Sequence, residues 1–236
     1  MSKLYNTLRA IKWNLRTSIR SMLVVWNFWN FLYIYKKMGP RTARLWGGGK
    51  IYLRNYSDVQ ILLEIFENSY AVTTFYPTVA DIGANIGMFS IFYARRFPDA
   101  KIDAFEPEPN NFKVLLQNTS PYKNITCHNI GIGSESKKMT LFLDKKNLGR
   151  HSLRQGWARH TESVVVAVEP LVGTFDLIKM DTEGAEYDIL KTIPKCKKLV
   201  MEIHEIEGES SEKLIQRLSV AYKVTDLGGH VFSFDT

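Results

Sequence analysis

The sequence predicts an α/β fold with parallel strands, and three observations support this prediction. Short β-branched runs alternate with helical segments over residues 46–236, the pattern of βαβ units. Residues 79–106 read in turn as strand, glycine turn, helix, strand and acid. Polar residues follow several of the predicted strands directly, and in an open α/β sheet the carboxyl ends of the strands form the ligand crevice.

The segment 79–106 is the centre of this prediction. Residues 79–82 form a short β-branched run, typical of a buried parallel strand. A helix is expected over residues 88–97 and ends before Pro98. A second strand, at residues 101–105, closes on Glu106. The order is that of a nucleotide-binding βαβ unit.

The turn at residues 83–87 carries the chemistry of this unit. Its small residues let the backbone approach a ligand, and the following helix N-terminus offers unpaired N–H groups. Glu106 follows Gly83 by the roughly 20 residues that the fingerprint expects and can accept hydrogen bonds from both ribose hydroxyls. Asp81 would repel a pyrophosphate, so the pattern favours a cationic or amino-bearing ligand such as S-adenosylmethionine. The alternative is an ordinary βα turn with a helix-capping Asn85.

The remaining elements follow in the same alternation. Further helices are expected at residues 58–67 (capped by Ser57), 110–118, 185–192 and 211–219. Further strands are expected at residues 50–54, 125–129, 138–143, 164–168, 175–180, 198–203, 222–225 and 231–234, with residues 130–133 turning away from the strand at 125–129. The third and fourth of these runs, and the last two, are predicted to pair as hairpins. The long loop of the first hairpin holds His151 and Arg154, and its length favours a functional role.

Charge is distributed unevenly along the 236 residues. The net charge is +7, yet the first acidic residue is Asp58 and eleven basic residues precede it. The sequence therefore predicts two parts, a basic and aromatic N-terminal helical arm at residues 1–45 and a mildly acidic domain at residues 46–236. This distribution does not support a nucleic-acid partner.

The arm has two predicted roles. Its basic and aromatic residues suit peripheral membrane contact through residues 1–37, or alternatively the arm packs as a roof over the active site. The apolar run at 22–35 is too short to span a bilayer, and no secretory cleavage site follows it. The two cysteines form neither a disulfide framework nor a metal motif, so a cytoplasmic location, with or without membrane association, is expected.

A second group of polar residues follows the strand predicted at residues 175–180. Asp181, Glu183 and Glu186 lie at its carboxyl end, and His204 closes the next predicted strand. These acids can hold a divalent metal or substrate hydroxyls, or they can simply add favourable charge to a helix N-terminus. No metal site is assigned from the sequence.

Three motifs together resemble the FkbM family of S-adenosylmethionine-dependent methyltransferases. They are Asp-Ile-Gly-Ala-Asn-Ile-Gly at 81–87, Ala-Phe-Glu-Pro-Glu-Pro at 104–109 and Ile-Lys-Met-Asp-Thr-Glu-Gly-Ala-Glu at 178–186. The resemblance covers roughly residues 54–204. It implies a Rossmann-like class I methyltransferase sheet of seven strands, six parallel and one antiparallel. It also implies O-methylation of a hydroxyl on a sugar, a glycan or glycolipid, or a natural product.

The same resemblance assigns the site residues. The methionine end of the cofactor is expected at the turn, the ribose at Glu106, and the transferring methyl group opposite Asp181 and Glu183. The full set of expected cofactor contacts is Asp81, Gly83, Ala84, Asn85, Gly87, Phe89, Glu106, Pro107, Asn129, Ile130 and Asp181.

The expected catalytic residues are His204, Asp181 and Glu183. His204 is the predicted general base, because the ordinary pKa of histidine suits neutral pH. A metal held by Asp181 and Glu183 is the alternative way to acidify the hydroxyl. His151 and Arg154 are candidates to bind an acidic or sugar acceptor, and the oligomeric state is left open.

Two other function classes compete with this interpretation. A nicotinamide-dependent Rossmann oxidoreductase is disfavoured by Asn85, which replaces the middle glycine of the dinucleotide motif, and by Asp81 beside the cofactor. A membrane-peripheral binding protein with a degenerate cofactor site is disfavoured because no motif residue is visibly lost.

Overall fold

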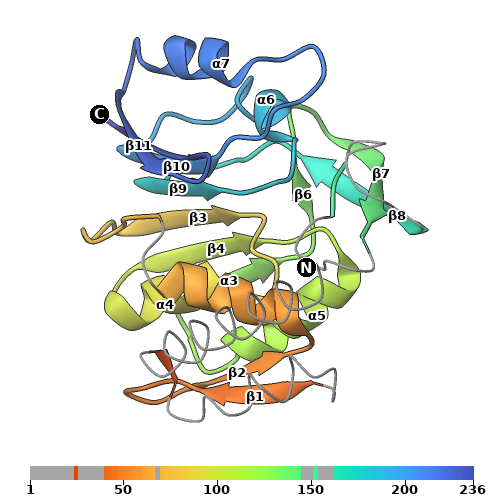
Figure 1. The fold of residues 1–236 in the computed structure, drawn as a ribbon, viewed down its shortest axis with the longest axis vertical. Coiled ribbons are helices and arrows are strands. Elements are labelled where there is room, and N and C mark those ends of the chain that lie inside the picture. Colours follow the sequence, from red (N-terminus) through yellow and green to blue (C-terminus); the bar gives the residue numbers. More distant parts are fainter. Residues whose placement is uncertain (1–23, 26–39, 67–69, 145–150, 154–161) are drawn as a thin grey trace, which may run out of the picture. The chain divides into compact units, whose positions relative to one another are not determined.

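The computed structural model describes residues 24–25, 40–66, 70–144, 151–153 and 162–236 (Figure 1). The chain divides into two compact units, residues 1–67 and residues 68–236. The sequence placed the boundary after residue 45, and that domain division stays a prediction. The helices expected in the arm lie outside the described residues, apart from Val24 and Val25.

The first unit contains a hairpin and a helix. Strands β1 (Arg41–Arg44) and β2 (Lys50–Leu53) pair antiparallel, and α3 (Tyr56–Phe66) follows. The expectation that Ser57 caps this helix is wrong, because the helix begins at Tyr56 and Ser57 lies within it. The Asn55 side chain instead accepts a hydrogen bond from the backbone N–H of Asp58, at 3.2 Å.

A seven-stranded sheet forms the centre of the second unit, in the order β11-β12-β10-β9-β3-β4-β5. Neighbouring strands pair parallel from β10 to β5, whereas β12 pairs antiparallel with both β10 and β11. Six strands therefore run in one direction and β12 in the other, which confirms the predicted sheet. The bounds are β3 (Thr78–Ile82), β4 (Lys101–Phe105), β5 (Ile125–His128), β9 (Leu177–Met180), β10 (Lys198–Glu202), β11 (Lys223–Gly228) and β12 (Val231–Asp235).

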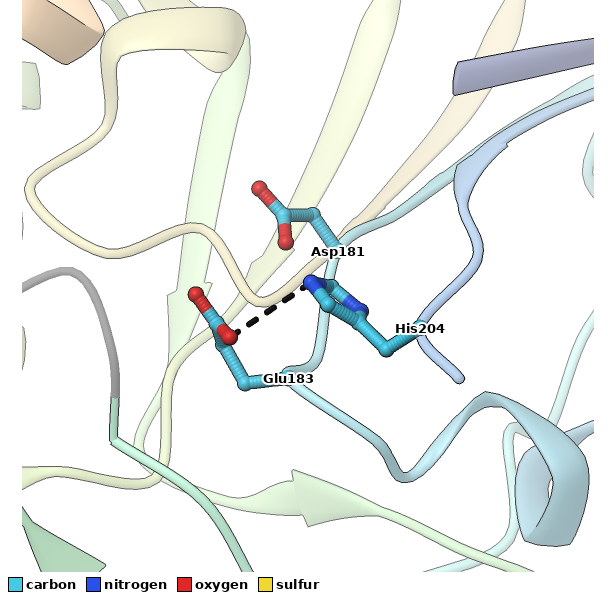
Figure 2. A group of neighbouring side chains, drawn as sticks. All are labelled: Asp181, Glu183 and His204. Atoms are coloured by element: carbon cyan, nitrogen blue, oxygen red, sulfur yellow. Dashed lines mark ion pairs between the residues drawn. The ribbon is translucent and has the colours of Figure 1, made fainter. Parts of the chain in front are cut away.

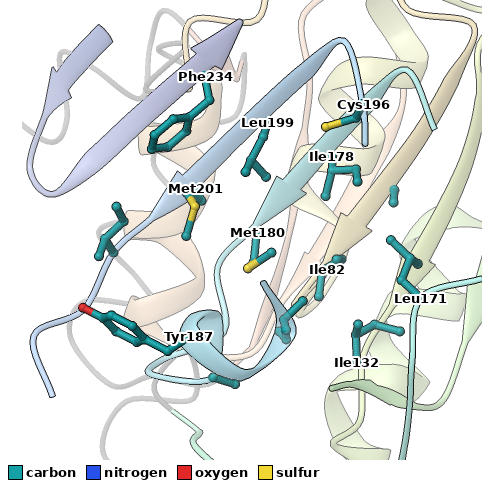
Figure 3. Packing of buried hydrophobic residues seen from close by; sticks show 14 of the residues in the cluster. Ile82, Ile132, Leu171, Ile178, Met180, Tyr187, Cys196, Leu199, Met201 and Phe234 are labelled. Atoms are coloured by element: carbon teal, nitrogen blue, oxygen red, sulfur yellow. The ribbon is translucent and has the colours of Figure 1, made fainter. Parts of the chain in front are cut away.

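Helices cover both faces of this sheet. On one face α6 (Glu186–Ile189) and α7 (Ser211–Leu218) pack over a hydrophobic cluster that includes Ile178, Met180 and Phe234 (Figure 3). Against the other face lie α4 (Met88–Arg96) and α5 (Pro109–Thr119), with Leu115 of α5 packed on Ala84 and Ala104. This alternation follows from strand geometry, in which successive side chains point to opposite faces.

The helix expected at residues 185–192 is shorter than predicted. Beyond α6 the chain continues in tighter turns, in which the N–H of Lys191 bonds to the carbonyl of Asp188 and the N–H of Thr192 to that of Ile189, each at 3.1 Å. Such i→i+3 bonds are typical of a helix end.

A separate three-stranded sheet lies beyond β5. Its strands are β6 (Gly131–Ile132), β7 (Lys137–Leu143) and β8 (Glu162–Glu169), and β7 pairs antiparallel with β8 as the predicted hairpin. Residues 131–132, expected as part of a turn, pair parallel with β8 instead. Two residues are too few for a periodic signal in the sequence.

No helix among the described residues combines the length and the apolar character that crossing a bilayer requires. This finding does not extend to the residues of the arm that the structure leaves undescribed.

We predict that truncating the core strand β10 destabilises the protein. Val200 is fully buried in β10, so Val200→Ala should lower the free energy of unfolding by about 2–3 kcal/mol through lost burial and a residual cavity. The matched control is Val165→Ala in β8, where the side chain is 65% exposed and the loss should stay below about 1 kcal/mol. Urea denaturation of both variants measures the difference, and equal losses would contradict the assigned burial.

Candidate functional site

The turn after β3 is fixed by backbone contacts. The carbonyl of Phe105 accepts hydrogen bonds from the N–H groups of Gly83 (3.1 Å) and Ala84 (2.9 Å). Gly83 has φ of 75°, and a Cβ at this position would lie 1.9 Å from the carbonyl oxygen of Asp181. Glycine is therefore required for two reasons, its left-handed backbone and the close approach of the segment that follows β9.

Asn85 serves the turn through its backbone. It has φ of 51°, and its N–H donates to Oε2 of Glu106 at 2.8 Å. The N-cap of α4 is Gly87, with φ of 89°, so the alternative of a helix-capping Asn85 is wrong. The turn and the acid at the end of β4 form one hydrogen-bonded unit.

The carboxyl group of Glu106 is almost completely buried beside this turn. Its Oε1 accepts a hydrogen bond from the N–H of Glu108 at 2.9 Å. Burial raises the pKa of Glu106 to about 7, although the backbone N–H groups of Glu108 and Asn85 act in the opposite direction. The group therefore titrates near neutral pH.

Pro107, Asn129 and Ile130 lie where the sequence placed them, after β4 and β5. The Asn129 side chain donates to the carbonyls of Glu106 (2.8 Å) and Pro107 (3.2 Å), which ties the two strand ends together. Phe89 is buried within α4, with its ring 5.8 Å from that of Tyr70.

Asp81 lies at the end of β3 but points into the protein. It is fully buried, its Oδ2 accepts a hydrogen bond from Ser90 at 2.7 Å, and its Oδ1 lies 3.2 Å from Nζ of Lys179. Lys179 also donates to the carbonyl of Gly83 at 3.1 Å. This arrangement differs from the expected one, in which Asp81 itself faces a ligand.

Sequence reasoning missed Lys179. Burial alone would lower its pKa, but the charges of Asp81 and Asp181 outweigh that effect and raise it, so the amine is protonated. The available signal was a lysine inside the otherwise apolar strand β9, because a buried lysine needs a charged partner.

Asp181, Glu183 and His204 meet at the carboxyl ends of β9 and β10 (Figure 2). One ligand atom from each lies within 4.8 Å of the others, and Oε2 of Glu183 is 3.4 Å from Nε2 of His204. Tyr70 donates to Oδ2 of Asp181 at 3.2 Å. The structure thus brings together the three residues that the sequence predicted as catalytic, and we call them the acid–histidine cluster.

Glu186 contacts both the loop after β9 and the imidazole of His204. Its Oε1 accepts hydrogen bonds from the hydroxyl of Thr182 (3.0 Å) and the N–H of Gly184 (3.1 Å), and it lies 3.1 Å from Nδ1 of His204. Because a carboxylate only accepts, Nδ1 of His204 carries the proton in this contact. Glu186 therefore fixes both the loop after β9 and the orientation of the imidazole.

The protonation of His204 differs from what the sequence suggested. Burial alone would lower its pKa, but the hydrogen bond to Glu186 and the charges of Glu183 and Asp181 outweigh it and raise the pKa to about 9. The imidazole is therefore charged at neutral pH. The ordinary pKa on which the general-base prediction relied does not apply here.

The hairpin loop reaches the acid–histidine cluster through Ser152. Its hydroxyl donates to the carbonyl of Glu183 at 2.6 Å. His151 accepts a hydrogen bond from the N–H of Asp144 at 3.1 Å through Nδ1. Arg154, the other predicted acceptor contact, lies outside the described residues.

The part of the chain that contains this site also matches a known protein family. Residues 81–228 match the model of the family described as the methyltransferase FkbM domain. That match contains the turn, Glu106 and the acid–histidine cluster.

Three curated relatives are methyltransferases by name. "Methyltransferase 1" of Beauveria bassiana is 28% identical over 48% of this chain and 57% of its own length. "Methyltransferase sdnD" of Sordaria araneosa is 31% identical over 50% of this chain and 60% of its own length. "31-O-demethyl-FK506 methyltransferase FkbM" of Streptomyces tacrolimicus is 24% identical over 57% of this chain and 68% of its own length. The chain thus spans about three fifths of the length of the first two relatives.

We predict that Lys179→Met strongly destabilises the protein, because it leaves Asp81 as an uncompensated buried charge. The free energy of unfolding should fall by about 3–5 kcal/mol. In the control Lys197→Met, an exposed ion pair with Asp176 (2.8 Å) is lost at a cost below about 1 kcal/mol.

The double variant Lys179→Met/Asp81→Asn should recover part of the loss, since it removes the orphaned charge. Guanidinium denaturation measures all three variants. A Lys179→Met loss no larger than that of the control would contradict the pairing.

Proposed function

The chain belongs to the FkbM methyltransferase family, and from this premise we propose that it transfers the methyl group of S-adenosylmethionine to a hydroxyl of a small-molecule or glycan acceptor. The family match covers both the turn and the acid–histidine cluster. That match alone assigns neither a cofactor nor an acceptor.

One observation carries the proposal: the turn at residues 83–87 contacts both Glu106 and Asp181, a member of the acid–histidine cluster. Its Asn85 N–H is bonded to Glu106, and its Gly83 lies against the carbonyl of Asp181. A ligand seated on this turn would therefore have a ribose-binding acid on one side and the acid–histidine cluster on the other. S-adenosylmethionine matches this layout, because its sulfonium methyl lies between its ribose and its amino-acid tail.

The remaining cofactor residues take supporting roles in this proposal. Glu106 accepts hydrogen bonds from the ribose, while Pro107 and Asn129 border the adenine together with Ile130. Asp81 positions the turn through Lys179 rather than contacting the ligand, because both of its oxygens face protein groups. Gly87, Ala84 and Phe89 shape the turn and the start of α4.

The transfer itself needs alignment and the loss of one proton. A lone pair of the acceptor oxygen forms the new C–O bond while the C–S bond breaks, and the bonding pair stays on sulfur. Asp181 and Glu183 hold the acceptor hydroxyl, with His204 in contact with it, and the hydroxyl proton leaves to solvent. Alignment supplies much of the rate, because the sulfonium is already an activated methyl donor.

The choice of a hydroxyl acceptor follows from the site and from one relative. The acid–histidine cluster offers acceptor oxygens to a hydroxyl hydrogen, and the Streptomyces relative is named for a 31-O-demethyl substrate. Whether residues 1–37 contact a membrane stays a prediction, since most of them lie outside the described residues.

Calorimetric titration with S-adenosylhomocysteine and, separately, with NADH tests the cofactor. We expect the homocysteine analogue to bind and NADH not to bind. Glu106→Ala should weaken binding at least tenfold, because the ribose hydroxyls lose their acceptor. The exposed Glu207→Ala serves as control and should bind like the wild type. Binding of NADH would favour the oxidoreductase, and binding of neither would overturn the cofactor assignment.

We predict that the affinity for S-adenosylhomocysteine rises between pH 6 and pH 8. Only the ionised Glu106 accepts from both hydroxyls, and its pKa of about 7 means that the ionised fraction grows as pH rises through that value. The dissociation constant should fall by roughly tenfold over this range. Calorimetry at pH 6, 7 and 8 measures it, and Glu106→Gln should remove the dependence. A flat wild-type profile would contradict the role of this carboxylate.

A further inference from the structure

We propose that the acid–histidine cluster binds a divalent transition-metal cation, with one donor atom each from Asp181, Glu183 and His204. The three ligand atoms lie within 4.8 Å of one another, a spread that a single ion can bridge. The inference rests on the proposed function only for the chemistry that the ion would perform. The site itself consists of contacts within this chain.

The donor set suits such a cation. Two carboxylate oxygens favour Mg²⁺ or Mn²⁺, and an imidazole nitrogen favours the transition metals, so Mn²⁺ satisfies both kinds of donor. Three protein ligands leave coordination positions open, as in catalytic rather than structural metal sites. Figure 2 shows that the three side chains converge from the loop after β9 and from the end of β10.

The surroundings of His204 provide a second observation. A metal-bound histidine usually donates its other ring N–H to a carboxylate, which fixes its tautomer and orientation. Here Nδ1 lies 3.1 Å from Oε1 of Glu186, while Nε2 faces Glu183. The imidazole is thus already held with Nε2 directed toward Glu183, and the proton on Nε2 leaves to solvent as the cation binds.

Charge and burial also favour a bound cation. Glu186 is fully buried, and its second oxygen, Oε2, has no hydrogen-bond partner among the residues that the structure describes. Glu202 adds a further carboxylate 3.5 Å from Nε2 of His204. A divalent ion would offset the concentration of negative charge that these side chains create with Asp181 and Glu183.

Within the proposed reaction the ion acts as a Lewis acid. The acceptor hydroxyl occupies an open coordination position, where its pKa falls and its proton leaves to solvent. An electron pair of the oxygen then forms the C–O bond as the C–S bond breaks, and the bonding pair of the C–S bond stays on sulfur. The ion itself is neither oxidised nor reduced.

Titration of the EDTA-treated, 236-residue protein with Mn²⁺ tests the site, and the electron paramagnetic resonance signal of the free ion measures binding. We expect saturable binding of about one Mn²⁺ per chain in the wild type, and at least tenfold weaker binding in Glu183→Gln and in His204→Gln. Glu186→Gln should weaken binding by about 10–100-fold, because it removes the group that orients His204. Glu207→Gln, an exposed glutamate close to His204 in sequence, should bind like the wild type.

Thermal melts and S-adenosylhomocysteine binding of the same samples show whether each variant is folded. A wild type that binds the homocysteine analogue but not Mn²⁺ would overturn the metal site and leave the proposed function intact. Binding of Mn²⁺ without binding of S-adenosylhomocysteine would support the metal site and contradict the cofactor assignment. Folded variants that retain wild-type Mn²⁺ affinity would place the ion elsewhere and overturn the proposal.

Discussion

The buried ion pair between Lys179 and Asp81 is the interaction on which the site depends. The two residues are direct neighbours across β9 and β3, so the parallel register alone sets them side by side on the same face of the sheet. A shift of that register by one residue would move Lys179 to the hydrophobic face that Ile178 and Met180 occupy. The same ammonium group holds the carbonyl of Gly83, so the register of the sheet and the shape of the turn are determined together.

Much of the fold could be predicted because its signals are local. The β-branched run before Gly83 and the proline after the following helix marked β3 and α4 nearly to the residue. The predicted strand at residues 101–105 matches β4 in full. The meeting of Asp181, Glu183 and His204 also followed from a general rule, since the carboxyl ends of neighbouring parallel strands share one edge of the sheet.

What the sequence did not reveal depends on contacts between distant residues. Asp81 looked like a ligand contact because its partner, Lys179, lies almost a hundred residues away. The pKa of His204 could not be anticipated, because three carboxylates approach it only in the folded chain. Strand β1 has no alternation of apolar residues in Arg-Thr-Ala-Arg, and it is defined by its pairing with β2. In each case tertiary structure outweighed the local pattern.

The contact between Gly83 and the carbonyl of Asp181 also has a dynamic consequence. With less space than a methyl group requires between the turn and the end of β9, neither segment can move toward the other independently. A ligand that immobilises the turn therefore restricts Asp181 as well, and a second ligand at Asp181 loses less conformational entropy on binding. Because such coupling is reciprocal, we expect each ligand to raise the affinity of the protein for the other.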